Sequence, residues 1–152
     1  MSDHCVAHAT FSLERTYSAA PARVFAAWAE PAAKARWFAG PDSGHRLDFR
    51  VGGREVAQGA NSDGDLLTFE SAYHDIVPSA RIVYSSTLSV RDKVATVSVT
   101  TVEFSPAGDG TRLLLTEQGT YLDGLEDPSW REQGTSQQLD ALDTELKESG
   151  TR

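Results

Sequence analysis

Hydrophobic and polar residues alternate near the beginning of the chain. Phe11, Leu13 and Tyr17 occupy every second position together with Arg15, and polar residues lie between them. This period of two is typical of a strand with one buried face. We therefore predict a first strand that ends before Ala19-Ala20-Pro21.

Two short helices are predicted after this strand. Pro21 suits the first turn of a helix that extends to about Trp28. Glu30-Pro31 interrupts the helical spacing, and a second helix is predicted from Ala32 to Phe38, before Gly40-Pro41.

From Arg46 to about residue 129 the chain has no helical period. Gly52-Gly53 and the polar segment from Asn61 to Asp65 are typical of turns between strands. The predicted strands are Leu47–Val51, Arg54–Gly59, Leu66–Val77, Arg81–Leu88, Lys93–Phe104 and Thr111–Tyr121. Short polar connections between consecutive strands favour an antiparallel meander.

One long amphipathic helix is predicted at the end of the chain, from Trp130 to about Glu148. Thr135, Leu139, Leu142 and Leu146 recur at i, i+4, i+7 and i+11, which is the spacing of one helix face. We expect the three leucines to face the sheet. The order of elements predicts an α+β fold in which a curved sheet wraps around this helix.

Length and composition restrict the class of protein. A chain of 152 residues corresponds to one domain, 1–152, at roughly 150 residues per domain. The single cysteine, Cys5, excludes an intramolecular disulfide. No apolar run approaches the roughly 20 residues that cross a bilayer, and residues 1–5 do not resemble a signal peptide. We expect a cytoplasmic protein that binds no membrane.

The formal net charge of −8 makes nucleic acid an unfavourable partner, because that binding depends on Lys and Arg. The acidic excess is uneven. Residues 1–116 carry 13 acidic and 11 basic side chains, whereas residues 117–148 carry 9 acidic and 2 basic ones. The C-terminal segment is either a solvated helix face or a docking surface for a basic protein.

Several short motifs occur in the order found in one known superfamily. They are Leu13–Tyr17, Ala20-Pro21, Val24–Trp28, Pro31, Arg36–Phe38, Asp48–Gly53, Tyr73–Pro78, Arg81–Tyr84, Gly110–Leu113 and Trp130 before Leu139–Leu142. Over roughly residues 8 to 148, the chain resembles the SRPBCC, or START-like, superfamily. Within it, the motifs are most similar to the branch named after the activator of the heat-shock-protein-90 ATPase.

The resemblance implies a helix-grip fold like that of the birch pollen allergen. In this fold a seven-stranded antiparallel sheet surrounds the C-terminal helix, two short helices follow the first strand, and a cavity between sheet and helix often accepts apolar small molecules. The superfamily includes lipid and hormone carriers, polyketide cyclases and co-chaperone domains, so the fold alone does not decide the function.

The residues themselves give few signs of metal or nucleophilic chemistry. His4, His8, His45 and His74 are scattered, whereas a metal site needs clustered ligands. No G-x-S-x-G motif occurs. We expect neither a metal nor a cofactor.

Aromatic and small residues on the predicted inner face of the sheet are the best candidates for ligand contacts. Alternation places Leu67, Ser71, Tyr73 and Asp75 on the face of Phe69, and it groups Ile82, Tyr84, Ser86 and Leu88. We expect Trp37 and Phe38 at the pocket mouth, and Trp28 and Trp130 in packing roles. The predicted ligand-binding set is Trp37, Phe38, Phe69, Ser71, Tyr73, Tyr84, Ser86, Glu117 and Leu139.

Two charged residues fall on the apolar faces of their strands. Arg15 alternates with Leu13 and Tyr17, and Glu117 alternates with Leu113 and Leu115. A charge on such a face must be paired or hydrated. We interpret Arg15 as part of a structural ion pair and Glu117 as a carboxylate in the cavity. His74 is expected to face solvent.

Three functional hypotheses follow. The first is a small-molecule-binding protein with a cavity for an apolar or aromatic ligand. The second is a cyclase, dehydratase or hydrolase that uses Glu117 as an acid or base, with Tyr73 or Tyr84 as a donor. The third is a co-chaperone-like protein-interaction domain. The first is favoured because no second catalytic group stands at a fixed spacing from Glu117.

Overall fold

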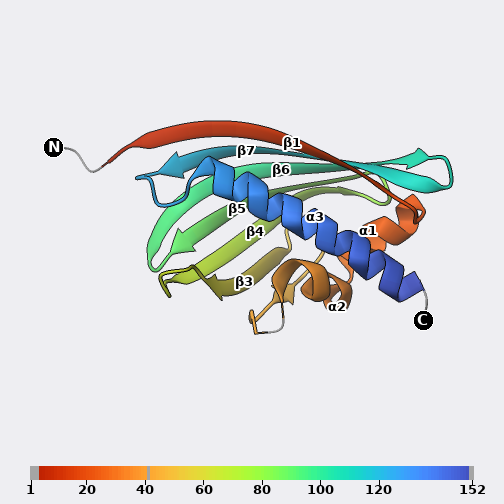
Figure 1. Cartoon of the computed structure of the whole chain (residues 1–152), viewed down its shortest axis with the longest axis horizontal. Helices are drawn as coiled ribbons and strands as arrows, with labels where there is room; N and C mark the ends of the chain where they lie inside the picture. Colours follow the sequence, from red (N-terminus) through yellow and green to blue (C-terminus); the bar gives the residue numbers. More distant parts are fainter. Residues whose placement is uncertain (1–3, 41, 151–152) are drawn as a thin grey trace.

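The computed structural model describes residues 4–40 and 42–150 and forms one sheet with helices on its concave side (Figure 1). The elements are β1 (Val6–Tyr17), α1 (Pro21–Ala29), α2 (Pro31–Lys34), the π-helical turn η1 (Ala35–Ala39), β2 (Arg46–Leu47), β3 (Arg54–Ala60), β4 (Leu66–Val77), β5 (Arg81–Val90), β6 (Lys93–Ala107), β7 (Gly110–Leu122) and α3 (Pro128–Gly150). Within these residues, seven antiparallel strands follow the order β1-β7-β6-β5-β4-β3-β2. This arrangement confirms the predicted helix-grip fold.

The strand predicted over residues 47–51 is shorter in the structure. β2 contains only Arg46–Leu47, because the chain turns directly afterwards and the Arg50 amide donates to the carbonyl oxygen of Asp48 at 3.1 Å. Gly53 closes this turn, and a Cβ atom there would lie 2.0 Å from the same carbonyl oxygen. The predicted glycine turn is therefore confirmed, but it begins earlier in the chain.

The predicted pair of short helices is present as α1 followed by α2 and η1. Pro21 and Pro31 lie in the first turns of α1 and α2. Gly40 ends η1 with a φ of 84°, a conformation that glycine adopts without a steric penalty. The indole Nε1 of Trp37 donates to the carbonyl oxygen of Ala27 at 2.9 Å. This bond ties η1 to α1 and fixes the orientation of the segment against the sheet.

A β-bulge in β4 changes which residues face the core. The register with β5 shifts between Tyr73 and Asp75, so the alternation is inverted beyond this point. Tyr73 is buried, whereas Asp75 forms an ion pair with Arg81 at 2.6 Å. The prediction that Asp75 shares the face of Phe69 is therefore wrong. His74 is exposed, as expected.

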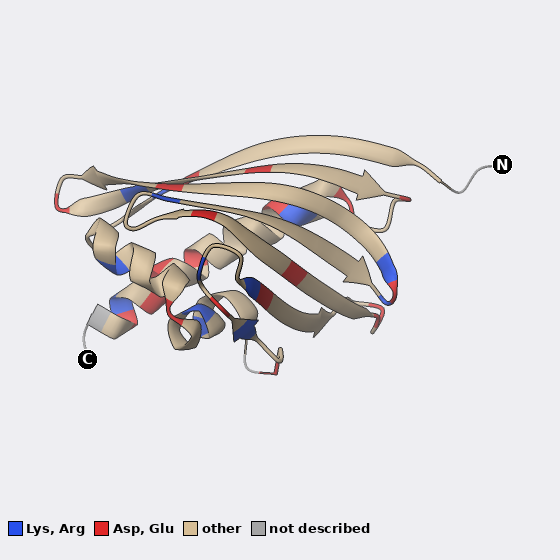
Figure 2. Ribbon diagram, turned by 180° about the vertical axis from the view of Figure 1, so that it is seen from behind, with Lys and Arg blue, Asp and Glu red and all other residues tan. Residues whose placement is uncertain are grey.

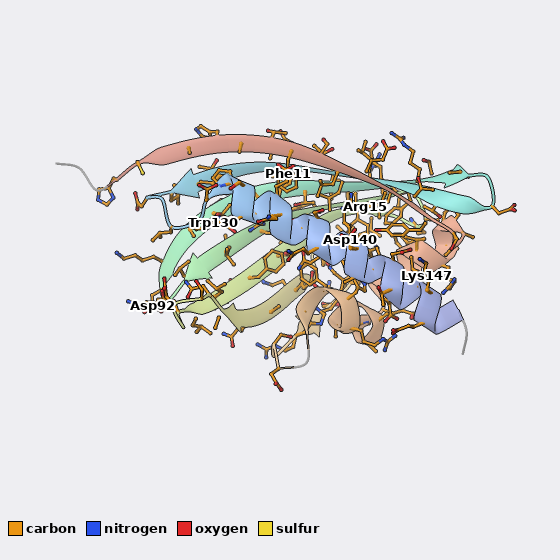
Figure 3. The ribbon with its side chains drawn as sticks, in the orientation of Figure 1. Phe11, Arg15, Asp92, Trp130, Asp140 and Lys147 are labelled. Atoms are coloured by element: carbon orange, nitrogen blue, oxygen red, sulfur yellow. The ribbon has the colours of Figure 1, made fainter. Side chains whose placement is uncertain are left out.

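The C-terminal helix packs as its leucine spacing predicts. α3 starts at Pro128, and Leu139, Leu142 and Leu146 are buried in the core. The Arg15 guanidinium on β1 donates to Asp140 at 3.2 Å, and the two residues lie side by side in Figure 3. Arg15 therefore forms an ion pair, as the sequence analysis predicts.

Basic residues neutralise part of the acidic C-terminal segment. Besides the pair of Arg15 and Asp140, Arg36 contacts Glu145 at 2.8 Å and Lys147 contacts Asp143 at 2.9 Å. Figure 2 shows basic and acidic segments interspersed along α3 and the short helices. Acidic and basic side chains therefore alternate on this surface. Such a surface supports docking to a basic partner less than the number of acidic residues in the sequence suggests.

No helix within residues 4–40 and 42–150 combines the length and the apolar character needed to pass through a bilayer. Across the same residues, no group of three or more His, Cys, Asp or Glu side chains is placed to hold a metal ion.

Candidate functional site

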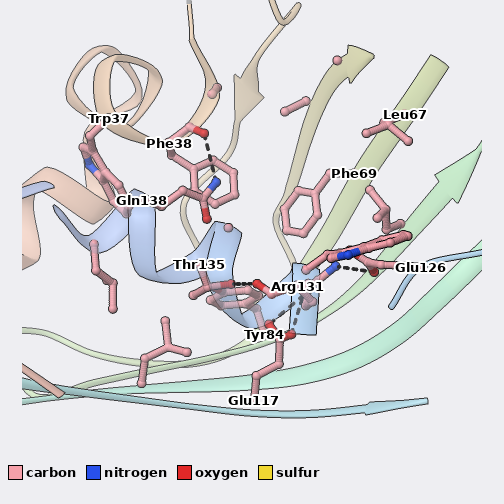
Figure 4. A pocket seen from close by; sticks show the side chains of 18 of the residues that line it. Trp37, Phe38, Leu67, Phe69, Tyr84, Glu117, Glu126, Arg131, Thr135 and Gln138 are labelled. Carbon is pink, nitrogen blue, oxygen red and sulfur yellow. Dashed lines mark hydrogen bonds and ion pairs between the residues drawn. The ribbon is translucent and has the colours of Figure 1, made fainter. Parts of the chain in front are cut away.

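A pocket of about 350 Å³ lies between α3, η1 and the inner face of the sheet (Figure 4). Trp37 and Phe38 form one side, and Leu67 and Phe69 form another. Apolar and aromatic side chains therefore make up most of the wall, which is typical of sites for small molecules.

The exposure of the lining residues distinguishes the inner end from the mouth. Tyr84, Leu115 and Leu139 are buried at the inner end. Trp130 and Gly134, which also line the pocket, are exposed. The pocket therefore opens to solvent beside the first turns of α3.

The first half of α3 contributes a continuous stripe to the pocket. Its lining residues are Trp130, Arg131, Gly134, Thr135, Gln138 and Leu139. Their spacing of three to four residues places all of them on one helix face. The second half of the same helix uses Leu142 and Leu146 to pack against the core, so α3 both closes the pocket and anchors the fold.

A buried group of charged residues forms the polar end of the pocket. The Nε atom of Arg131 donates to Oε2 of Glu117 at 2.8 Å, and Nη1 of Arg131 lies 3.6 Å from Oε1 of Glu126. Thr100 donates to Glu117 at 3.0 Å and Thr96 donates to Glu126 at 2.5 Å. Glu117 and Arg131 come from β7 and α3, so this ion pair bridges sheet and helix.

Arg131 remains charged in this position. Burial alone would lower the pKa of Arg131, but the carboxylates of Glu117 and Glu126 outweigh burial and raise the pKa above its ordinary value. The guanidinium therefore neutralises one of two adjacent carboxylates.

The structure places part of the predicted ligand-binding set around the pocket. Those that line it are Trp37, Phe38, Phe69, Tyr84, Glu117 and Leu139. The other three lie outside the described lining. Ser71 and Ser86 hydrogen bond to each other at 2.8 Å, and Tyr73 donates to Glu55 at 2.8 Å. Their polar groups are thus satisfied within the protein.

The positions of Trp37 and Trp130 differ from those predicted for them. Trp37 is buried rather than at the rim, whereas Trp130, which was expected to anchor the helix, is 64% exposed and lines the pocket. Trp130 lies in the first turn of α3 (Figure 3).

Trp28 also lines the pocket. Its indole Nε1 is buried and has no hydrogen-bond partner among the residues that the structure describes. A buried donor of this kind is usually paired with a protein group, a water or a ligand acceptor.

A second buried ion pair lies behind the aromatic wall. The ammonium of Lys34 donates to Oε1 of Glu55 at 2.9 Å, and both side chains are fully buried. Tyr73 donates to the same oxygen, and Nε2 of His45 lies 2.7 Å from Oε2. Because a carboxylate only accepts, Nε2 of His45 carries the proton in this arrangement.

The aromatic rings of the pocket also surround the Lys34 ammonium. Its Nζ atom lies 4.3 Å from the ring centre of Phe38 and 5.1 Å from that of Trp28. These contacts add cation–π attraction to the ion pair.

Burial and ion pairing shift the pKa of Glu55 in opposite directions. Burial alone would raise the pKa of Glu55, but the charge of Lys34 and the hydrogen bonds from His45, Lys34 and Tyr73 lower the pKa to about 2. Burial lowers the pKa of Lys34 despite the opposing effect of Glu55.

Sequence reasoning missed Lys34, Glu55, His45 and Arg131. One signal was available for Glu55, since alternation places it on the same face of β3 as the buried Ala57. Lys34 is also one of only three lysines in the chain. Neither signal identifies the partner, because the two residues of each pair come from different elements.

Comparisons with known proteins agree with this architecture. A protein from Rhizobium leguminosarum is 40% identical and has a TM-score of 0.90, covering 95% of this chain and 98% of its own. The Mll3558 protein from Rhizobium loti is 43% identical with a TM-score of 0.87, covering 93% and 99%. Protein CV1439 from Chromobacterium violaceum is 26% identical with a TM-score of 0.76, covering 90% and 96%.

The comparison with curated proteins gave no significant match. The family described as Activator of Hsp90 ATPase homolog 1-like protein matches residues 18–147. This match spans every element from α1 to most of α3, and the chain belongs to that family.

Proposed function

We propose that the protein binds an apolar or aromatic small molecule in the pocket between α3 and the sheet. The observation that carries this proposal is the pocket itself, with a volume of about 350 Å³ and an aromatic wall. This volume lies within the range of about 300–1,000 Å³ of ligand sites in proteins. Membership of the family is consistent with a fold that binds ligands, but it does not identify the ligand.

The geometry supports binding more than acid–base catalysis. Both oxygens of Glu117 accept hydrogen bonds, Oε2 from Arg131 and Oε1 from Thr100. A general acid or base must exchange a proton with its substrate, and a carboxylate held by a guanidinium is poorly placed for this. Glu117 therefore serves to orient Arg131 and the polar end of a ligand.

Filling the mouth of the pocket tests the proposal. Gly134 lies between Trp130 and Gln138 on the lining stripe of α3, and a Cβ atom there would meet nothing within 4 Å. The substitution Gly134→Leu should preserve folding, since glycine is about 0.8–1 kcal/mol less favourable than alanine in a helix interior and leucine ranks directly after alanine. We expect it to weaken binding of naphthylethanol, a neutral aromatic probe, by about tenfold.

Isothermal titration calorimetry, together with the shift of the melting temperature by the probe, measures this effect. Gln133→Leu is the matched control, because residue 133 is the exposed neighbour on the same helix. It adds the same side chain outside the lining and should leave binding unchanged. Equal binding by the unaltered protein and by Gly134→Leu would contradict the proposed site.

A further inference from the structure

The polar end of the pocket carries more negative than positive charge. Glu117, Arg131 and Glu126 all line the pocket, and their side chains are only 5%, 11% and 13% exposed. Two carboxylates therefore share one guanidinium. Among the residues that the structure describes, Thr96 and Arg131 both contact Glu126 through its Oε1 atom, and a carboxylate has further acceptor sites to offer.

The other buried charges near the pocket do not cancel this excess. Lys34 and Glu55 form a pair with a nitrogen–oxygen distance of 2.9 Å, so together they add no net charge. The sum over Lys34, Glu55, Glu117, Glu126 and Arg131 is one negative charge. In a site shielded from water, such an excess attracts a cation more strongly than it would at the surface.

The aromatic wall suits the same kind of ligand. Aromatic rings attract cations through their negative faces. The protein's own cations already lie over five rings of the pocket. The Lys34 ammonium lies 4.3 to 5.8 Å from the ring centres of Phe38, Trp28, Trp37 and Tyr84, and the Arg131 guanidinium lies 5.9 Å from that of Phe69. Trp130 at the mouth adds further aromatic surface.

We infer that the pocket selects ligands in which a protonated amine is attached to an aromatic or apolar body. The ammonium would approach the carboxylates of Glu117 and Glu126, and the apolar body would contact Phe38, Phe69 and Trp130. This inference rests on the proposed function and names the class of ligand that the same pocket prefers.

Three matched probes test the preference in the unaltered protein. Naphthylethylamine, naphthylethanol and naphthylpropionate share one ring system and differ in the charge of the polar end. We expect calorimetry to show that the amine binds about tenfold more tightly than the alcohol. The carboxylate should bind most weakly, because it would face the negative excess of Glu117 and Glu126.

Removing one negative charge should abolish the preference. Glu126→Gln keeps the shape and an acceptor for Thr96 but leaves Glu117 and Arg131 as a neutral pair. We expect the amine and the alcohol to bind this variant with nearly equal affinity. Glu14→Gln is the control, since it changes the net charge equally at an exposed ion pair with Arg112, and it should keep the preference.

The outcomes separate the inference from the proposed function. Equal affinities of the unaltered protein for amine and alcohol, or tighter binding of the carboxylate, would overturn the inference, while the binding itself would still support the pocket. No binding of any of the three probes would contradict the pocket and the inference together. Because the first comparison needs no substitution, it is decisive even where Glu126→Gln fails to fold.

Discussion

The substitution Glu55→Gln should destabilise the protein by about 3–5 kcal/mol, which is typical for removing one partner of a buried ion pair. Lys34 is fully buried and receives its compensating charge from Glu55 at 2.9 Å. Glutamine has nearly the same shape, so the loss reflects charge rather than packing. Urea denaturation followed by circular dichroism measures the change in the free energy of unfolding.

The dependence on pH identifies the cause of this loss. Burial lowers the pKa of Lys34 from 10.5 even beside Glu55, and Glu55→Gln removes the opposing charge, so the pKa should fall further. The unfolded state then binds the proton more tightly than the folded state, so the variant should regain stability as the pH rises towards 10.5. A cavity or a packing defect would instead leave the stability difference from the unaltered protein unchanged as the pH rises.

A decrease in pH should lower the stability of the unaltered protein. The pKa of Glu55 is lowered from 4.5 to about 2, so its contribution to stability is complete above pH 4.5 and is lost as the pH falls towards 2. The difference in stability between the unaltered protein and Glu55→Gln should therefore become smaller over this interval.

A double substitution provides the control. Lys34→Met combined with Glu55→Gln removes both charges and keeps a long apolar side chain, so most of the lost stability should return. If the double variant is no more stable than Glu55→Gln, an uncompensated lysine charge is not the cause. The two substitutions form a double-mutant cycle with the unaltered protein.

The substitution Leu142→Ala should cost about 2–5 kcal/mol, the usual range for truncating a buried leucine. Leu142 is fully buried on the second half of α3, between the buried Leu139 and Leu146. The substitution removes apolar contacts and leaves a cavity between helix and sheet. A clear decrease in the midpoint of urea denaturation, without a change in slope, is the expected observation.

Thr144→Ala is the matched control for this prediction. Residue 144 is exposed on the same turn of α3, so its truncation should change stability by at most about 0.5 kcal/mol. Similar effects of both substitutions would mean that the leucine stripe does not anchor the helix.

Much of the fold could be predicted because each element leaves a local pattern. Alternation at Phe11, Leu13 and Tyr17 indicated β1, and the leucine spacing indicated α3. These patterns are reliable where one face is buried, since burial selects apolar residues at the period of the backbone. The bulge at His74 was missed because an extra residue changes the period without a characteristic sequence.

The sequence determined the order of the elements, the inward faces of most strands and the aromatic character of the pocket, because all of these depend on residues close together in the chain. Only the tertiary structure decided the partners of the buried charges. It paired Lys34 with Glu55 and Arg131 with Glu117, and it left Trp130 at the mouth. The spacing of apolar residues along a strand or helix shows which side chains point inward. The compensation of a buried charge depends instead on atoms a few ångströms away on another element. The position of those atoms is fixed only when the sheet and the helices pack together.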